Sequence, residues 1–76
     1  MAHRVMRITL NGELREVTAG HTVASLLSDL GVQAERVAVE VNRLIVDRGT
    51  FAGTAIHEGD QVEVIGFIGG GGEVGA

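Results

Sequence analysis

The sequence predicts an α+β domain in which one main helix packs on one face of a mixed sheet of four to five strands. Two patterns carry this prediction. Several short segments alternate apolar and polar residues, as half-buried strands do. A segment between them instead spaces its apolar residues by three and four positions, as amphipathic helices do. One helix lying across one face of a sheet buries both apolar surfaces.

Residues 6–18 are predicted to form a β-hairpin. Three apolar residues share one face of its first strand: Met6, Ile8 and Leu10. Asn11-Gly12 is typical of a two-residue type I′ turn, because both residues tolerate the positive φ that this turn requires. The register of the return strand, residues 13–18, stays open, since Leu14 and Val17 point to opposite faces and a bulge or a longer loop would shift the pairing.

Residues 22–30 are predicted to form the helix. Thr22 suits the N-cap, because its hydroxyl can accept a hydrogen bond from a free N–H of the first turn. Gly31 follows at the position where a left-handed residue commonly ends a helix. Four apolar residues form one stripe along this segment: Val23, Leu26, Leu27 and Leu30.

Three later segments are predicted strands: residues 37–41, 44–46 and 61–68. Asn42-Arg43 forms the turn between the first two, and the second is a short strand or edge. Residues 47–54 are expected to be irregular, and residues 57–60 have the composition of a turn. In the last strand Val62 and Val64 share one face.

The last strand runs directly into a run of glycines. Ile65 and Phe67 project from the other face of this strand, and the alternation stops after Ile68. Four consecutive glycines follow, and we expect residues 69–76 to form a flexible tail. A backbone without Cβ atoms can also enter a slot that any other residue would block, so a thin arm inserted into another protein is the alternative reading.

Length and composition limit the chain to one small domain. It has 76 residues, of which 45% are hydrophobic, and it contains neither cysteine nor lysine. The lack of cysteine excludes disulfides, thiolate metal sites and a cysteine nucleophile. The net charge of −4 argues against nucleic acid and anionic membranes as partners, because both bind basic surfaces. There is no apolar run of signal-peptide or membrane-span length, so we expect a cytoplasmic location.

No group of residues predicts catalysis, a metal site or a bound cofactor. The three histidines, at positions 3, 21 and 57, lie far apart in the sequence and are interpreted as solvated turn or terminal residues. Ser25 and Ser28 are interpreted as surface serines of the helix, with no histidine at a helical spacing. Gly70, Gly72 and Gly75 have the spacing of a dinucleotide-binding loop, but such a loop must open a helix, and none is predicted there.

Six pieces of the sequence, taken in order, resemble one known family: residues 6–13, 22–27, 39–42, 45–46, 59–64 and 67–71. The family is that of the ThiS sulfur carriers of thiamine biosynthesis. Its members are small ubiquitin-like β-grasp domains, so the resemblance implies this fold for residues 6–68. It also implies that residues 1–5 are a disordered extension, because Met6 fits the usual start of the family.

The resemblance implies a protein co-substrate rather than an enzyme. In this family an E1-like adenylyltransferase, ThiF, uses ATP to adenylate the carboxylate of the terminal glycine. Sulfur from a cysteine desulfurase route then replaces AMP, and the resulting thiocarboxylate supplies thiazole synthase, ThiG, with sulfur for the thiazole ring. Aligned on Phe67-Ile68, the family terminus falls at Gly71, with Gly72 as the second choice. Gly69, Gly70 and Gly71 are then the part of the tail that enters a partner.

The chain departs from the family because residues 72–76 follow the expected terminus. A peptide bond after Gly71 blocks adenylation, so we expect a peptidase to remove these residues. The alternatives are that this form is inactive or that the extra residues are an error in the gene assignment.

Two other functions stay open. The small subunit of molybdopterin synthase shares the fold and the diglycine chemistry, but its members tend to carry prolines before the terminal motif, and this chain has none. The second alternative is a passive β-grasp interaction module whose tail is only a linker. In either sulfur-carrier reading, we expect Ile65, Phe67 and Ile68 to contact the partner, although Phe67 can equally cap the core.

Overall fold

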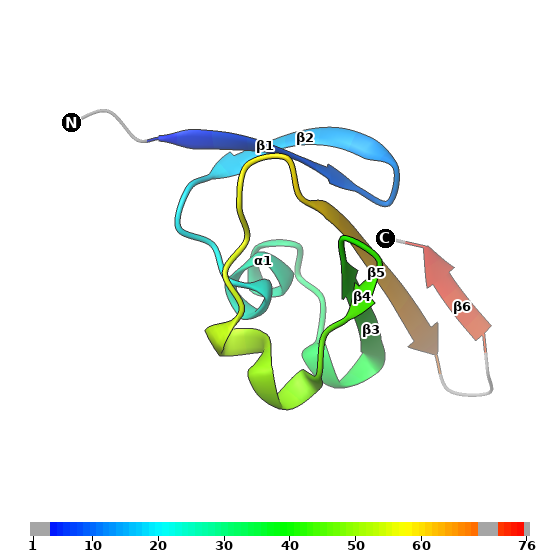
Figure 1. Cartoon of the computed structure of the whole chain (residues 1–76). Coiled ribbons are helices and arrows are strands. Elements are labelled where there is room, and N and C mark those ends of the chain that lie inside the picture. The colour runs from blue at the N-terminus through cyan, green and yellow to red at the C-terminus, as the bar shows by residue number, and fades with distance from the viewer. Residues whose placement is uncertain (1–3, 69–71, 76) are drawn as a thin grey trace.

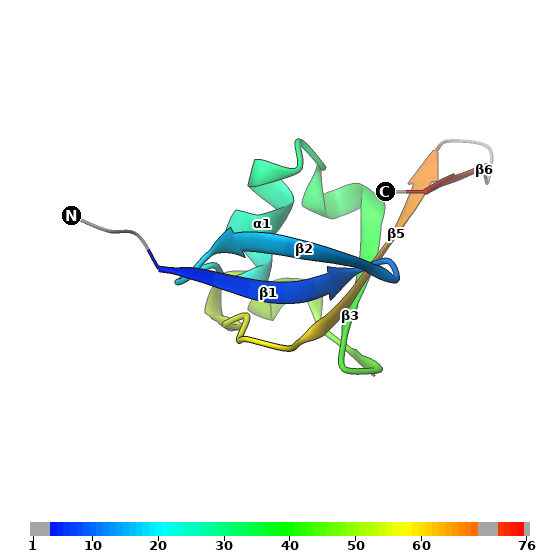
Figure 2. The same cartoon turned by 90° about the horizontal axis from the view of Figure 1, so that it is seen from above.

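The computed structural model describes residues 4–68 and 72–75. Along the chain, the elements are β1 (Val5–Leu10), β2 (Glu13–Thr18), α1 (Val23–Asp29), the 3₁₀ helix η1 (Ala34–Arg36), β3 (Val37–Val41), β4 (Leu44–Ile45), the 3₁₀ helix η2 (Arg48–Gly53), β5 (Gln61–Ile68) and β6 (Gly72–Gly75). The α-helix and the two 3₁₀ helices lie on one side of a strongly twisted sheet (Figures 1 and 2).

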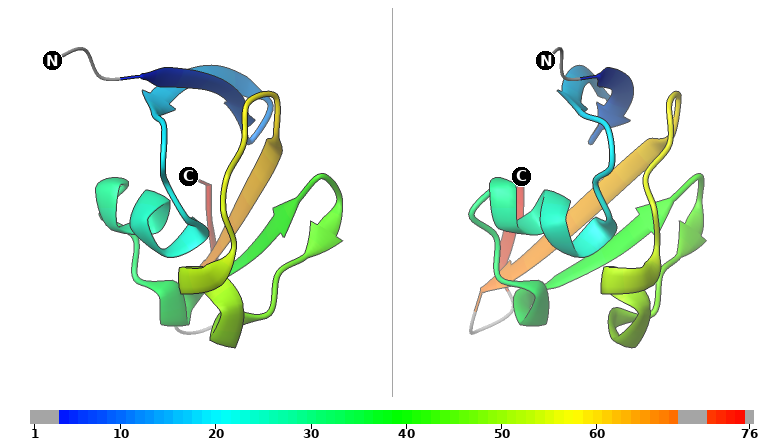
Figure 3. Two further views of the ribbon diagram at one scale, coloured as in Figure 1. Left: turned by 60° about the vertical axis from the view of Figure 1, so that its left-hand side comes forward. Right: turned by 90° about the vertical axis from the view of Figure 1, so that its left-hand side faces the viewer.

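The sheet is mixed, as predicted. Five strands follow the order β2-β1-β5-β3-β4, and β6 pairs with β5 outside this path. The central pair, β1 and β5, is parallel, whereas the other pairs are antiparallel. The order places β5 between the two hairpins, so the strand that leads to the glycine run is the middle strand of the sheet. Figure 3 shows α1 below the β1–β2 hairpin, on the same side of the sheet as the two 3₁₀ helices.

The first hairpin has the register that a two-residue turn gives. Leu10 pairs with Glu13 and Val5 with Thr18, with no bulge between them. Asn11 and Gly12 have φ of 51° and 83°, which is the backbone of the predicted type I′ turn. The strand begins at Val5, one residue earlier than predicted, and residues 1–3 lie outside the described part of the chain.

The helix begins and ends as the sequence predicts. Thr22 Oγ1 accepts a hydrogen bond from the Ser25 N–H at 3.1 Å. Ser25 Oγ in turn accepts one from the Thr22 N–H at 2.9 Å, which completes a capping box. Gly31 has a φ of 71°, the left-handed conformation that ends the helix. Three residues of the predicted stripe are buried, namely Val23, Leu26 and Leu27, and Leu30 is partly buried.

The segment of residues 47–54 was expected to be irregular, and this expectation is wrong. Residues Arg48–Gly53 form η2, which packs beside α1 and brings Phe51 into the core with only 4% of its surface exposed. The other buried apolar residues come from the sheet, the helix and the loop before β5: Met6, Ile8, Leu10, Val23, Leu26, Leu27, Val37, Val39, Ile56, Val62 and Val64. Within the described ranges, no helix has the length and apolarity needed to cross a membrane.

Candidate functional site

The candidate site is the end of β5 together with the face of the sheet that points away from α1, here called the outer face. Ile65 lies on this face opposite Ala38 of β3, and 37% of its surface is exposed. Its neighbours Val64 and Gly66 are buried, as expected for a strand whose residues alternate between the core and the outer face. The prediction that Ile65 projects away from the core is therefore confirmed.

Exposed apolar side chains lie on the outer face, spread over β1, β2, β4 and β5. The register of the strands places four of them there: Val5, Leu14, Ile45 and Ile65. Polar and acidic side chains lie between them, because Glu63 of β5 pairs with Glu40 of β3. Of these four residues, Ile65 is the one on the strand that leads to the glycine run.

The remaining predicted site residues belong to the tail. Phe67 and Ile68 continue β5, and only their backbone is described. Gly69, Gly70 and Gly71 lie outside the described residues, whereas Gly72 begins β6. No strand was predicted after Ile68, so β6 is an element that the sequence pattern does not reveal. The role of the tail as an inserted arm stays a prediction.

Two turns fix the start of β5 in place. At the β3–β4 turn, Asn42 has a φ of 53°, its Nδ2 donates to Asp60 Oδ1 at 3.0 Å, and its Oδ1 accepts from the Gln61 N–H at 3.0 Å. Asp60 is 9% exposed, and its Oδ2 accepts from the His57 N–H at 2.8 Å. These bonds set where the strand begins and therefore where its far end, with the tail, leaves the domain.

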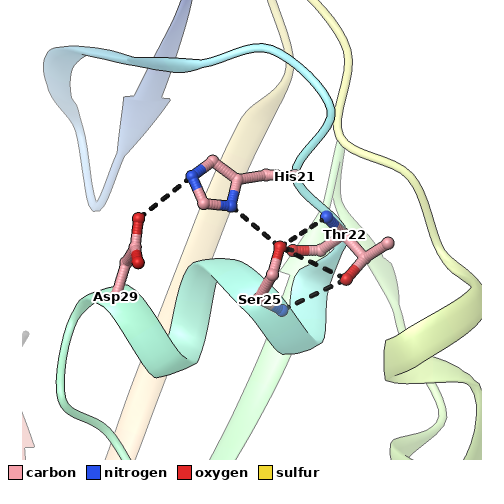
Figure 4. A network of polar contacts seen from close by, with 4 residues as sticks. All are labelled: His21, Thr22, Ser25 and Asp29. Carbon is pink, nitrogen blue, oxygen red and sulfur yellow. Dashed lines mark hydrogen bonds and ion pairs between the residues drawn. The ribbon is translucent and has the colours of Figure 1, made fainter.

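A histidine, a serine and an aspartate meet beside α1, a cluster that was not predicted from the sequence (Figure 4). His21 Nδ1 lies 2.8 Å from Ser25 Oγ, and His21 Nε2 lies 3.1 Å from Asp29 Oδ2. The prediction that no histidine stands at a helical spacing from the helix serines is thus wrong, because His21 precedes Ser25 by four residues. Ser25 in turn precedes Asp29 by four residues. The His21 side chain is only 13% exposed, so it is not solvated, whereas the His57 side chain is 76% exposed as predicted. His3 lies outside the described residues.

This cluster has the residue types of a hydrolase triad but the connections of a helix cap. Ser25 Oγ accepts from the Thr22 N–H, and its single hydroxyl proton has two acceptors within reach, the Thr22 carbonyl oxygen at 3.2 Å and His21 Nδ1 at 2.8 Å. With its proton on Nε2, His21 donates to Asp29 and accepts from Ser25. The arrangement therefore joins the end of the β2–α1 connection to both ends of the helix. Within residues 4–68 and 72–75, no three His, Asp or Glu residues are placed to hold a metal ion.

The chain is similar to known proteins over most of its length. The model of the ThiS family matches residues 8–71. The crystal structure of thiamine biosynthesis protein ThiS from Geobacter metallireducens has a TM-score of 0.73 and 43% sequence identity, and the match covers 87% of this chain and 100% of that one. The prediction of a ubiquitin-like β-grasp fold is therefore confirmed. The sulfur carrier protein ThiS of Escherichia coli is 33% identical over 66 residues, which cover 87% of this chain and 100% of that protein.

A second kind of relative is much longer than this chain. A thiazole synthase from Magnetococcus marinus is 50% identical over 66 residues, and the match covers 87% of this chain but 20% of that protein. A thiazole synthase from Paramagnetospirillum magneticum is 46% identical over 66 residues with the same coverage. The chain thus spans about a fifth of the length of the thiazole synthases that it matches.

Proposed function

The chain belongs to the ThiS family, and from this premise we propose that it is a sulfur carrier of thiamine biosynthesis that acts as a co-substrate. The proposal rests on the position at which the match to the family ends. It runs to residue 71, the third glycine after β5. Gly71 is thus our choice for the residue whose carboxylate receives sulfur, with Gly72 as the second choice.

The chemistry needs a free carboxylate and an external source of activation. A carboxylate is a poor electrophile because its oxygen is a poor leaving group. A ThiF-like adenylyltransferase would join it to AMP from ATP and release pyrophosphate. The persulfide of a cysteine desulfurase route would then attack the acyl carbon and displace AMP, and a thiol would reduce the resulting acyl disulfide and leave a thiocarboxylate. The chain contributes no side chain to these steps and binds no cofactor of its own in this proposal.

A free carboxylate at Gly71 requires hydrolysis of the bond to Gly72. We therefore propose that a peptidase cleaves after Gly71. Glycines on both sides of this bond leave it unshielded by side chains, which favours access by a narrow protease cleft. The intact mass of the active protein isolated from its host tests this step, and a mass that still includes residues 72–76 contradicts it.

A thiazole synthase is the proposed recipient of the sulfur. The support comes from the two thiazole synthases that contain a segment similar to this chain within a protein of about five times the matched length. A domain that shares a polypeptide with an enzyme is held near its active site at high effective concentration. Co-purification with a thiazole synthase, rather than with the large subunit of molybdopterin synthase, is the expected result.

Mass spectrometry tests the central proposal. The chain ending at Gly71 is incubated with a ThiF-like adenylyltransferase, ATP and a sulfur donor. Exchange of one oxygen for sulfur adds about 16 Da to the chain. The chain ending at Ala76 and a reaction without ATP serve as controls that should gain no mass, and a chain ending at Gly72 tests the second choice. If neither shortened chain gains this mass, the assignment as a sulfur carrier is wrong.

A further inference from the structure

The edge of β5 that faces β1 is covered by three different pieces of the chain. β1 pairs with its start, through Thr9 opposite Gln61 and Leu10 opposite Val62. The Asn11 side chain covers the next position: its Oδ1 accepts from the Val64 N–H at 2.8 Å, and its Nδ2 donates to the Val64 carbonyl at 3.2 Å. Beyond Val64 the first hairpin turns away, and β6 takes over the same edge (Figure 1).

The backbone groups exposed beyond Val64 follow from strand alternation. Successive residues of a strand direct their N–H and C=O groups to opposite edges. Because Val64 directs both groups toward Asn11, Gly66 and Ile68 direct theirs to the same edge. In the structure these two residues pair with Val74 and Gly72 of β6. Without β6, this end of β5 presents unpaired donors and acceptors, which is the usual template for adding a strand from another protein.

The strand that occupies this edge is weak by composition. It has four residues, two of which are glycine, and it pairs with β5 alone. Glycine is unfavourable within strands because it loses much backbone entropy and offers no side chain for packing. Among residues 4–66, whose burial is described, the last residue of the hydrophobic core is Val64, and β6 pairs with the part of β5 that follows it.

We propose that residues 72–75 are a placeholder strand, which covers the edge of β5 at Gly66 and Ile68 until an extended backbone segment of the adenylating enzyme takes its place. The second half of this inference rests on the proposed function. Gly72 lies opposite Ile68, so β6 runs back along β5 in the uncleaved chain. The same strand thus keeps the edge covered and the cleavage bond close to the domain. Removing residues 72–76 exposes the edge and releases the end of the chain together.

Two proline variants of the full chain test the placeholder. The alternation along β6 directs the Val74 N–H toward Gly66 and the Glu73 N–H away from β5. Val74→Pro therefore removes a pairing donor, whereas Glu73→Pro is the matched control, since proline is tolerated in an edge strand where its nitrogen faces solvent. We expect amide hydrogen exchange at Gly66 and Ile68 to be about tenfold faster in Val74→Pro than in the unaltered chain or in Glu73→Pro. Equal exchange in all three chains overturns the placeholder.

The chain ending at Gly71 tests the replacement. Its Gly66 and Ile68 amides should exchange rapidly in isolation and become protected when a ThiF-like adenylyltransferase binds. The amides of Val64 and Ile65, which face Asn11 and β3, serve as internal references and should stay protected throughout. If the chain gains sulfur while Gly66 and Ile68 stay unprotected in the complex, replacement by an enzyme strand is wrong and the proposed function stands. If the chain never gains sulfur, the proposed function fails, and the comparison of the full-length variants still decides whether β6 is a placeholder.

Discussion

Asn11 and Val64 lie 53 positions apart in the sequence and are joined by two hydrogen bonds, both through the side-chain amide of Asn11. The same residue holds the left-handed backbone of the first turn, with a φ of 51°. Its own N–H also donates to the Val62 carbonyl at 2.9 Å. One residue thus closes the hairpin and continues the pairing of β1 along β5, which connects the first turn of the chain to its last core strand.

Replacing Asn11 should separate these two roles. Asn11→Gly keeps the turn but leaves the Val64 N–H and C=O without partners, and we expect a loss of about 1–2 kcal/mol in the free energy of unfolding. Asn11→Ala adds the strain of a left-handed alanine, about 1 kcal/mol more. Urea denaturation of the two variants measures both effects. Equal stability of the glycine variant and the unaltered chain would show that the amide contributes nothing.

The Asp60 carboxylate should contribute more to stability than the exposed carboxylates do. It is buried and accepts hydrogen bonds from the His57 N–H and from the Asn42 side chain. We expect Asp60→Ala to lower the free energy of unfolding by about 2–4 kcal/mol, because two donors lose a charged acceptor. The control is Glu63→Ala, at an exposed position of β5 three residues further on, which should change stability by less than about 0.5 kcal/mol. Thermal unfolding of both variants is the measurement, and similar effects of the two would contradict this account.

The cluster of His21, Ser25 and Asp29 should matter for folding and not for sulfur chemistry. Ser25→Ala removes half of the capping box and the contact with His21, so we expect a loss of about 1–2 kcal/mol in stability. The same variant, in the chain ending at Gly71, should gain sulfur as completely as the unaltered chain at a temperature where both are folded. Loss of loading with unchanged stability would give this cluster a chemical role instead.

The predictable parts of the fold are those set by local patterns. The alternation of apolar and polar residues predicted β1, β3 and β5, and the 3.6-residue spacing of apolar residues predicted α1. Both patterns arise because each element buries one face and exposes the other. Phe51 was missed since its burial depends on a 3₁₀ helix whose glycine-rich sequence has no period of its own. The pairing of Asn42 with Asp60 was missed because it joins two turns that only the folded sheet brings together.

The candidate site was predictable to a different extent. Ile65 could be placed on the outer face because it follows a buried valine in an alternating strand. The His21–Ser25 contact was visible as a spacing of four residues but lies partly before the helix, where a search restricted to helical positions does not look. The pairing of β6 with β5 had no signal in the sequence, since two of its four residues are glycine and backbone pairing does not need side chains.

Ile65 should contribute to binding of the adenylating enzyme rather than to stability. It lies on the outer face of β5, four residues before the first glycine of the run, and 37% of its surface is exposed. In the chain ending at Gly71, we expect Ile65→Ser to weaken binding to a ThiF-like adenylyltransferase about tenfold, since loss of an apolar interface side chain commonly costs this much. The melting temperature should change less than it does for a core substitution, because Ile65 is not one of the buried core residues.

Leu44→Ser is the matched control for this measurement. Leu44 is 72% exposed, and it pairs with Val41 at the sheet edge formed by β4, away from the glycine run. It should leave both binding and melting temperature unchanged. Phe67→Ser, measured in parallel, distinguishes the two readings of the aromatic residue: weaker binding at unchanged melting temperature places it in the interface, whereas a lower melting temperature at unchanged binding assigns it to the core. If Ile65→Ser binds the adenylyltransferase as tightly as Leu44→Ser does, the enzyme contacts the tail alone and the outer face is not part of the interface.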